Sequence, residues 1–418
     1  MSLFALLAEP LPRLLVQIAL IVLLSRSLGL VARRLGQPLV IAEITAGILL
    51  GPSLFGWLAP EAHALVFAPD SLKVLGLVSQ LGLVIFMFLI GLELDPALLR
   101  GRAQTSIAIS HSSIVVPFGM GAVLAVFLYP RLSVPGVALL PFALFLGAAM
   151  SITAFPVLAR ILAEQRLLQT RMGAIAIACA AIDDVTAWCI LAVVVAVTRS
   201  QGMGAAGLTI GLALSYIAFM FFVARPILAR VASRTRRDVI TQNKVAIVFL
   251  CLLCSSLVTE LIGIHALFGA FLFGVIVPKQ GDLTQVLGEK LEELVLVALL
   301  PLFFAYSGVR TQLGLLDTPS AWAICALIIA VACLGKFGAS AVAARLTGLS
   351  WRESSVLGVL MNTRGLMELI VLNIGLDLGV IGPELFTMMV IMALFTTFMT
   401  SPLVRLLYPA AHRTPDLQ

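Results

Sequence analysis

Long apolar segments alternate with short polar or Pro/Gly-containing stretches along almost the whole chain of 418 residues. A helix that crosses a membrane needs about 20 mostly apolar residues, and polar clusters, Pro and Gly mark its ends. Division at these breaks predicts roughly thirteen membrane helices, over residues 14–31, 40–55, 72–92, 106–129, 137–162, 173–198, 208–231, 245–262, 266–277, 294–309, 321–346, 354–376 and 385–407. No cleavage site of small residues follows a short apolar run at the start, so we expect the first segment to remain as a helix. The pattern predicts an all-α polytopic membrane protein.

The composition excludes a soluble globular protein. Hydrophobic residues make up 61% of the chain, charged residues make up 11%, and the mean hydropathy is +1.11. Because little of the chain lies outside the apolar segments, we expect one integral membrane domain over residues 1–418 and no soluble regulatory domain. The six cysteines lie inside apolar segments, which argues against a disulfide framework, and Cys251 and Cys254 have no second pair at the spacing of a zinc site.

The net charge of +6 raises the question of nucleic acid as a partner. The basic residues are scattered over loops rather than gathered on one face, so we expect membrane lipid and no nucleic acid. Nineteen Lys and Arg residues fall on one side of the predicted helices and five on the other, with Arg26, Lys336 and Arg364 inside segments. Since basic loops stay in the cytoplasm, this count predicts an external N-terminus, a cytoplasmic C-terminus and an odd number of spans.

The chain contains a weak internal repeat. Gly51 resembles Gly274, Gly91 resembles Gly308, and Met150 resembles Met361, each with similar neighbours, at offsets of 223, 217 and 211 residues. The predicted copies cover about 37–198 and 244–407, and an odd number of spans between them would place them inverted in the membrane, as in many secondary transporters. Chance similarity between helices rich in Gly, Phe and Leu is the alternative interpretation.

Two adjacent acids, Asp183 and Asp184, lie in the middle of the sixth apolar segment. An acid at the centre of a membrane helix costs about 2.5–3.5 kcal/mol on insertion scales, and a neighbouring acid adds repulsion. A carboxylate away from water is stabilised by a proton, a metal ion or a lysine, so two acids in a dry site can exchange a proton for a cation. Burial for packing or helix capping is the alternative, although acids inside membranes are functional by default.

Helix-breaking residues interrupt the fifth and twelfth segments at corresponding points of the two predicted copies. Paired discontinuous helices point to a binding site near the membrane midplane, because their freed carbonyl and hydroxyl groups can bind a cation. A simple packing kink is the alternative. The residues at the two breaks are Ser151, Thr153, Pro156, Asn362, Thr363 and Arg364.

Other charged residues inside or beside the segments need partners. Lys336 lies near the middle of its segment, too deep to reach the interface easily, so we expect it to pair with Asp183 or Asp184, although it could line a polar cleft. Arg364 and Glu368 stand four residues apart and can neutralise each other, in either a structural or a functional role. Three further residues are interpreted as structural or pH-sensing, namely Glu43, Glu260 and His265.

These residues resemble the motifs of the monovalent cation:proton antiporter-2 family, which includes sodium/proton antiporters, Kef-type exchangers and plant cation/proton exchangers. The motifs cover 37–53, 150–160, 181–188, 259–265, 301–304 and 361–365, almost from end to end. The resemblance implies thirteen helices, a dimerisation domain, and a six-helix core in which two broken helices cross near the ion site. It also implies a homodimer that works by an elevator-like motion, and Kef-type regulation would need a separate subunit.

The resemblance also assigns roles to individual residues. It implies that Asp184 binds the cation and the proton, that Asp183 pairs with Lys336, and that Ser151 and Thr153 belong to the crossing. We therefore expect a secondary antiporter of a bacterial inner membrane that exchanges Na⁺ or K⁺ for protons, is electrogenic, and uses no cofactor. A cation channel on the same scaffold is the alternative, while an intramembrane aspartyl protease is disfavoured because its acids should come from different helices. The sequence leaves open the choice among Na⁺, K⁺ and Li⁺.

Overall fold

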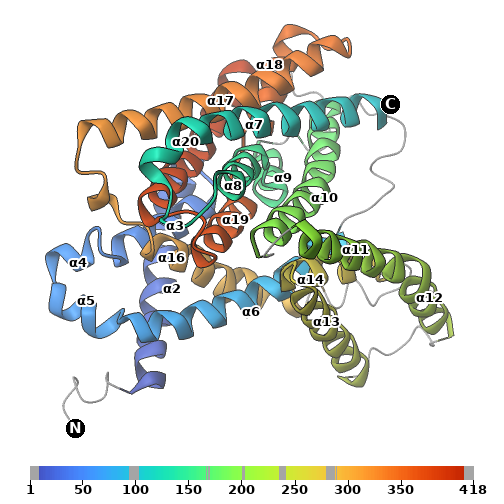
Figure 1. Ribbon diagram of the computed structural model, residues 1–418, viewed down its shortest axis with the longest axis horizontal. Helices are drawn as coiled ribbons and strands as arrows, with labels where there is room; N and C mark the ends of the chain where they lie inside the picture. Colours follow the sequence, from blue (N-terminus) through green and yellow to red (C-terminus); the bar gives the residue numbers. More distant parts are fainter. Residues whose placement is uncertain are drawn as a thin grey trace. The chain divides into compact units, whose positions relative to one another are not determined.

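The computed structural model describes residues 9–93, 103–165, 167, 170–199, 203–234, 242–278, 288 and 290–408, and they fold as helices joined by short connections (Figure 1). The main helices are α2 Pro10–Arg34, α3 Leu39–Leu50, α4 Phe55–Leu58, α5 Pro60–Val66, α6 Pro69–Glu93, α7 Ala103–Leu132, α8 Leu139–Ser151, α9 Phe155–Glu164, α10 Arg171–Arg199, α11 Met203–Phe219, α12 Arg225–Arg234, α13 Gln242–Ile262, α14 Ala266–Ile276, α16 Leu300–Val309, α17 Pro319–Leu346, α18 Trp351–Met361, α19 Leu366–Asp377 and α20 Pro383–Leu407. Short π-helical turns η2 (Met220–Ala224) and η3 (Val295–Leu299) precede α12 and α16, and a 3₁₀ turn η4 covers Leu313–Leu315.

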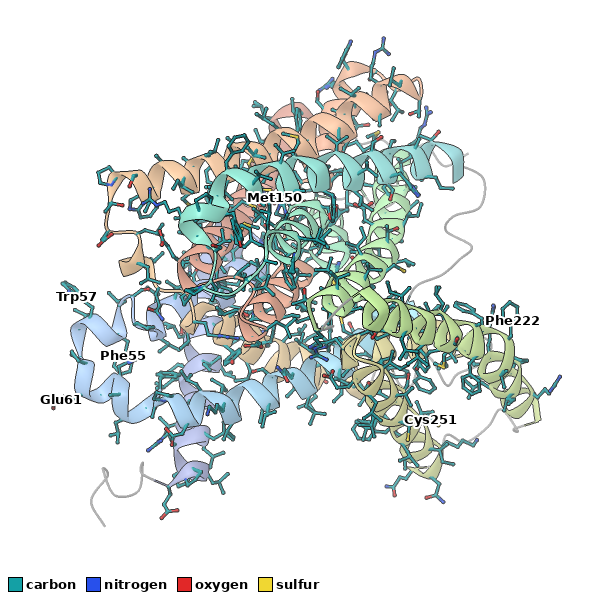
Figure 2. The ribbon with its side chains drawn as sticks, in the orientation of Figure 1. Phe55, Trp57, Glu61, Met150, Phe222 and Cys251 are labelled. Carbon is teal, nitrogen blue, oxygen red and sulfur yellow. The ribbon has the colours of Figure 1, made fainter. Side chains whose placement is uncertain are left out.

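Each of the thirteen apolar segments is helical, which confirms the all-α prediction. Among the described residues, 11 helices are long and apolar enough to cross a membrane, and the bent pair α18 and α19 raises the number to 12. The ninth predicted segment, α14, is a shorter apolar helix of 11 residues. Large apolar side chains such as Trp57 and Phe222 are 75% and 80% exposed and point away from the helices that carry them (Figure 2). Such side chains suit a surface that faces lipid.

The chain divides into two compact units, and the acid pair lies in the first. Unit 1 comprises Met1–Ser71, Pro96–Ile190 and Phe304–Gln418. Within it α7 runs alongside α17, as Figure 1 shows. Helix α7 also packs against α8, while α18 and α20 pack against α17. These helices form the polar-lined interior in which the breaks of both discontinuous helices lie.

Unit 2 comprises Leu72–Asp95 and Leu191–Phe303. Within it α13 pairs with α14 around a tight turn at Gly263 and His265, both of which have positive φ. Helix α6 packs so closely on α14 that a Cβ atom at Gly274 would overlap the carbonyl of Phe88. Glycine at this point lets the two backbones touch, which is common where membrane helices pack.

Candidate functional site

The two discontinuous helices meet at their breaks. Helix α8 ends at Ser151, the next residues are extended, and α9 begins with Pro156 in its first turn, where a missing N–H removes no helical hydrogen bond. The second break separates α18 from α19, whose axes differ by 41°. The Ala154 amide donates to the Thr363 carbonyl at 3.0 Å, so backbone at one break satisfies backbone at the other. Such satisfaction is required inside a membrane, where water cannot replace a lost partner.

The second break depends on Gly365 and on a threonine of α20. Gly365 has φ 155°, and a Cβ atom there would lie 2.9 Å from the side chain of Val157, so a larger residue would separate the two breaks. The Thr397 hydroxyl accepts a hydrogen bond from the Arg364 amide at 3.1 Å and donates one to the Arg364 carbonyl at 2.6 Å. Both backbone groups of Arg364 are thereby satisfied outside a helix.

Asp183 on α10 is saturated with hydrogen-bond donors. Its side chain is fully buried, and the donors are Ser110 at 2.5 Å, Ser113 at 2.9 Å, Thr153 at 2.7 Å and Lys336 at 3.1 Å. The contact with Lys336 is the ion pair implied by the resemblance, and both side chains are 0% exposed. A buried charge is tolerated when it is paired and hydrogen-bonded in this way.

Asp184, the next residue on α10, has the opposite environment. It is 1% exposed, and neither carboxylate oxygen has a hydrogen-bond partner among the described residues. The Phe155 amide at the first turn of α9 faces this carboxyl without making a hydrogen bond. Because adjacent helical residues point about 100° apart, Asp183 can form the ion pair with the lysine while the carboxylate oxygens of Asp184 accept no hydrogen bond. A proton or a desolvated cation would satisfy those lone pairs.

The C-terminal end of α8 is covered by two cations. The Arg364 guanidinium donates to the carbonyls of Ala149 at 2.8 Å and Met150 at 2.7 Å, and the Lys336 ammonium donates to the carbonyl of Ser151. These carbonyls have no partners within the helix and carry its partial negative charge, so buried cations stabilise them. Figure 2 marks Met150, which is fully buried among the helices of unit 1.

The remaining residues of the breaks make local contacts. Arg364 pairs with Glu368 at 2.9 Å, as their spacing predicts. The Ser151 hydroxyl donates to the Ala148 carbonyl rather than to an acid, Asn362 donates to Cys333 Sγ at 3.5 Å, and Thr363 donates to Thr400 at 3.4 Å. Asn362 Oδ1 and Glu368 Oε1 are buried without a hydrogen-bond partner among the described residues.

The other candidates lie away from the acid pair or in the other unit. Glu43 on α3 is 8% exposed, and Arg26 and Arg160 provide the positive charge that acts on it. In unit 2, Glu260 pairs with Arg199 at 3.2 Å and accepts from the Ala266 amide at 2.9 Å.

His265 accepts from the Leu267 amide at 3.4 Å, so this histidine and Glu260 cap the turn before α14. Among the described residues, no group of three or more His, Cys, Asp or Glu side chains could hold a metal ion.

Sequence reasoning did not identify Ser110, Ser113 and Thr397 as site residues. The signal for the first two was the polar run Ser-His-Ser-Ser over 110–113 inside an otherwise apolar segment. Thr397 carried no distinguishing signal, because its role is to bond backbone that lies 33 residues earlier.

Comparison with known proteins places the chain among membrane transporters. The sequence matches the family described as sodium/hydrogen exchanger, transmembrane, over residues 18–406. It is 45% identical over 399 residues to the Na⁺/H⁺ antiporter NhaS4 of Synechocystis, with 95% of this chain and 97% of that protein covered. It is 44% identical to cation/H⁺ antiporter 17 of Arabidopsis thaliana and 33% identical to K⁺/H⁺ antiporter 1 of Saccharomyces cerevisiae, and it spans about half the length of each, 49% and 47%.

A solved structure has the same fold. The sodium proton antiporter MjNhaP1 of Methanocaldococcus jannaschii superposes with a TM-score of 0.70 at 15% sequence identity, with 97% of this chain and 99% of that chain covered. The family resemblance drawn from the sequence motifs is therefore confirmed. The chain belongs to the sodium/hydrogen exchanger family of integral membrane transporters.

Proposed function

We propose that the chain is a secondary antiporter that exchanges Na⁺ or K⁺ for protons by alternating access, with Asp184 as the carboxylate that binds cation and proton in turn. The observation that carries this proposal is the contrast between the two acids. Asp183 has four donors, whereas Asp184 is equally buried and has none that forms a hydrogen bond among the described residues. An isolated buried carboxylate is stable only with a proton or a cation beside it, so the two ligands compete for one place.

The surroundings favour a cation that has lost its water. The first break places the Thr153 hydroxyl 2.7 Å from Asp183 and the Ser151 carbonyl on Lys336. Oxygen groups of this kind can replace part of the hydration shell of a monovalent ion that enters beside the acids. The names of the relatives support Na⁺ or K⁺ as the cation, since Na⁺/H⁺ and K⁺/H⁺ antiporters are both among them. The liposome assay described below distinguishes between these ions.

We further propose that transport is electrogenic. The Lys336 ammonium shares Asp183 with three hydroxyl groups, so a cation that draws on Asp183 weakens the ion pair, and the lysine can then release a second proton. More protons than cations would then move in each cycle.

Orientation, repeat and assembly complete the proposal. The loop charges favour an external N-terminus and a cytoplasmic C-terminus in a bacterial inner membrane, and the two copies over 37–198 and 244–407 would be inverted repeats. We also propose a homodimer with an elevator-like motion of the core, on the family resemblance stated above.

The test uses purified protein in liposomes that contain a pH-sensitive dye and hold an imposed proton gradient. Na⁺, K⁺ or Li⁺ is added outside, with Asp184→Asn and the control Asp70→Asn, an exposed acid away from the site, measured alongside. We expect one cation to dissipate the gradient through wild type and Asp70→Asn but not through Asp184→Asn, and a membrane potential to change the rate. Conductance without proton counterflow would favour the channel, and an active Asp184→Asn variant would reject the proposed site.

A further inference from the structure

Two buried serine hydroxyls near the acid pair lack a well-aligned hydrogen-bond partner among the described residues. Ser106 on α7 is 1% exposed and Ser340 on α17 is 0% exposed. The Ser106 hydroxyl faces the Cys179 thiol, which is a weak partner, and neither serine hydroxyl makes a well-aligned hydrogen bond in the part of the chain that the structure describes. Serine and threonine in helices usually donate to a carbonyl of the preceding turn, as Ser79 and Thr186 do. A buried polar atom without a partner destabilises a protein, so each such atom in a native structure calls for an explanation.

Ser106 lies one helical turn from the Asp183 contact. Ser110 on α7 donates to Asp183, and the Ser106 carbonyl accepts from Cys179 Sγ at 3.5 Å. The contact between Ser106 and Cys179 lies four residues before the contact between Ser110 and Asp183 on both helices. Helices α7 and α10 therefore run parallel, and Ser106 and Cys179 lie at the same height along them. This level is on the side of the acid pair where α7 and α10 begin.

Ser340 lies on the same side of the pair. Lys336 donates to the Ser113 carbonyl at 2.8 Å, while Gly335 meets Pro117 of α7, so α17 runs antiparallel to α7. Ser340 follows Lys336 by one turn on the same face of α17. Because the two helices are antiparallel, Ser340 lies beside the part of α7 that precedes Ser113, which is the part that carries Ser106. The two serine hydroxyls therefore flank the same end of the ion pair.

We propose, on the basis of the antiport proposed above, that Ser106, Cys179 and Ser340 bound a buried water-binding site through which protons reach the Asp183–Lys336 pair from the side where α7 and α10 begin. A buried water typically makes about three hydrogen bonds to groups that lack other partners, and two hydroxyls on facing helices supply donors and acceptors for it. Cys179 forms a wall and joins α7 to α10 at this level. In the proposed orientation this is the cytoplasmic side, so protons would reach Asp183 and Lys336 from the end of the pair where α7 and α10 begin.

A pair of measurements on serine variants tests this inference. Ser106→Ala, Ser340→Ala and the double variant are assayed in liposomes for proton flux over a range of cation concentrations. Loss of the water predicts a maximal flux about tenfold lower in the double variant, which corresponds to about 1.4 kcal/mol of barrier, with the half-saturating cation concentration unchanged. Ser340→Thr keeps a hydroxyl and should retain the flux. Flux in the double variant equal to that of wild type would overturn the inference.

The control is Ser25→Ala. Ser25 on α2 is also buried, its hydroxyl has no hydrogen-bond partner among the described residues, and α2 packs mainly on α3. Its removal should leave the flux unchanged, and an equal loss there would reject the specific route.

Thermal unfolding in detergent gives a readout that does not depend on transport. A dry, unpartnered hydroxyl is destabilising, so its removal would raise the Tm, whereas removal of a hydroxyl that binds water lowers it or leaves it unchanged. A raised Tm in Ser106→Ala and Ser340→Ala would therefore refute the water site even if wild type showed no antiport at all. A Tm that is not raised, together with water density between α7 and α17 in an experimental structure, would support it.

Discussion

Replacement of Lys336 by methionine isolates the contribution of the buried ion pair. The Nζ atom lies 3.1 Å from Asp183 Oδ2, both side chains are fully buried, and the ammonium also donates to the carbonyls of Ser113 and Ser151. Methionine keeps most of the side-chain length and removes the charge and all of these bonds. The variant therefore leaves Asp183 as a buried carboxylate with hydroxyl partners only.

The distance sets the expected magnitude. Two unit charges 3.1 Å apart attract by about 5 kcal/mol at an effective dielectric constant of about 20. Removal of one partner of a buried pair typically costs about 3–5 kcal/mol, because the remaining charge is left uncompensated. Asp183 keeps the donors Ser110, Ser113 and Thr153, so we expect a loss of about 3 kcal/mol, at the lower end of that range. The double variant Lys336→Met/Asp183→Asn carries no uncompensated charge and should be more stable than Lys336→Met alone.

The assay is a double-mutant cycle of thermal unfolding for the purified protein in detergent. Wild type, Lys336→Met, Asp183→Asn and the double variant are compared, and the interaction appears as a decrease in Tm of the double variant that is much smaller than the sum of the two single decreases. The control is Asp70→Asn, which breaks an exposed pair with Arg13 at 3.5 Å and should shift stability by less than about 1 kcal/mol. Additive decreases for Lys336→Met and Asp183→Asn would refute the reasoning, since they would mean that the two charges do not stabilise each other.

Three further outcomes follow from single contacts. Thr153→Val removes the hydroxyl that lies 2.7 Å from Asp183 and 3.0 Å from the Met361 carbonyl, and should lower the unfolding free energy by about 1–3 kcal/mol, whereas Thr153→Ser should retain most of it in the same melts. Gly47→Ala places a methyl group against the Ala305 carbonyl and should destabilise by about 1–3 kcal/mol. Gly338→Ala should not, because no atom of the described residues outside its own helical turn lies within 4 Å of a Cβ atom there, and an equal Tm for the two variants would contradict the packing. Burial lowers the pKa of His63 from its usual 6.5, and the centre of its ring lies 5.7 Å from those of both Phe55 and Phe67. The folded protein therefore favours the neutral histidine, and stability should fall as the pH drops below 6.5. His63→Leu should reduce this loss in Tm measured against pH, and an unchanged pH profile would show that another group is responsible.

The helices could be predicted from the sequence because membrane burial imposes a simple requirement on composition and length. All thirteen apolar segments are helical, and both interruptions fall at the predicted polar residues. The packing of the glycines was not predictable, since it depends on which segments meet. Gly47 packs on Gly308 within unit 1 and Gly91 packs on Gly274 within unit 2, a reciprocal pairing of the motifs that suggested the repeat. The inverted repeat stays a prediction, and each unit by itself contains one such close contact between glycines.

The candidate site was partly predictable for a related reason. A charge in a membrane helix stands out against apolar neighbours, so Asp183, Asp184, Lys336 and Arg364 could be chosen without a structure. Arg364 was expected to neutralise Glu368, and it does, but its bonds to the α8 carbonyls depend on a crossing 214 residues away in sequence. A side chain that hydrogen-bonds to backbone groups of a distant segment cannot be recognised from its neighbours in sequence, because those backbone groups belong to another segment.

The contrast between the two acids explains why a membrane transporter would carry adjacent carboxylates at all. With one acid, the lysine and the cation would compete for the same oxygens, and a lysine at 3.1 Å would hold the site against a monovalent ion of equal charge. With two acids on one helix, Asp183 accepts hydrogen bonds from the lysine and three hydroxyls, while the carboxylate oxygens of Asp184 accept none among the described residues. In the proposed mechanism the arrangement therefore divides the roles between the two acids, because Asp183 holds the lysine and Asp184 is left for the cation or the proton. It also couples them, because the negative charge that repels within the pair falls whenever a proton or a cation reaches Asp184.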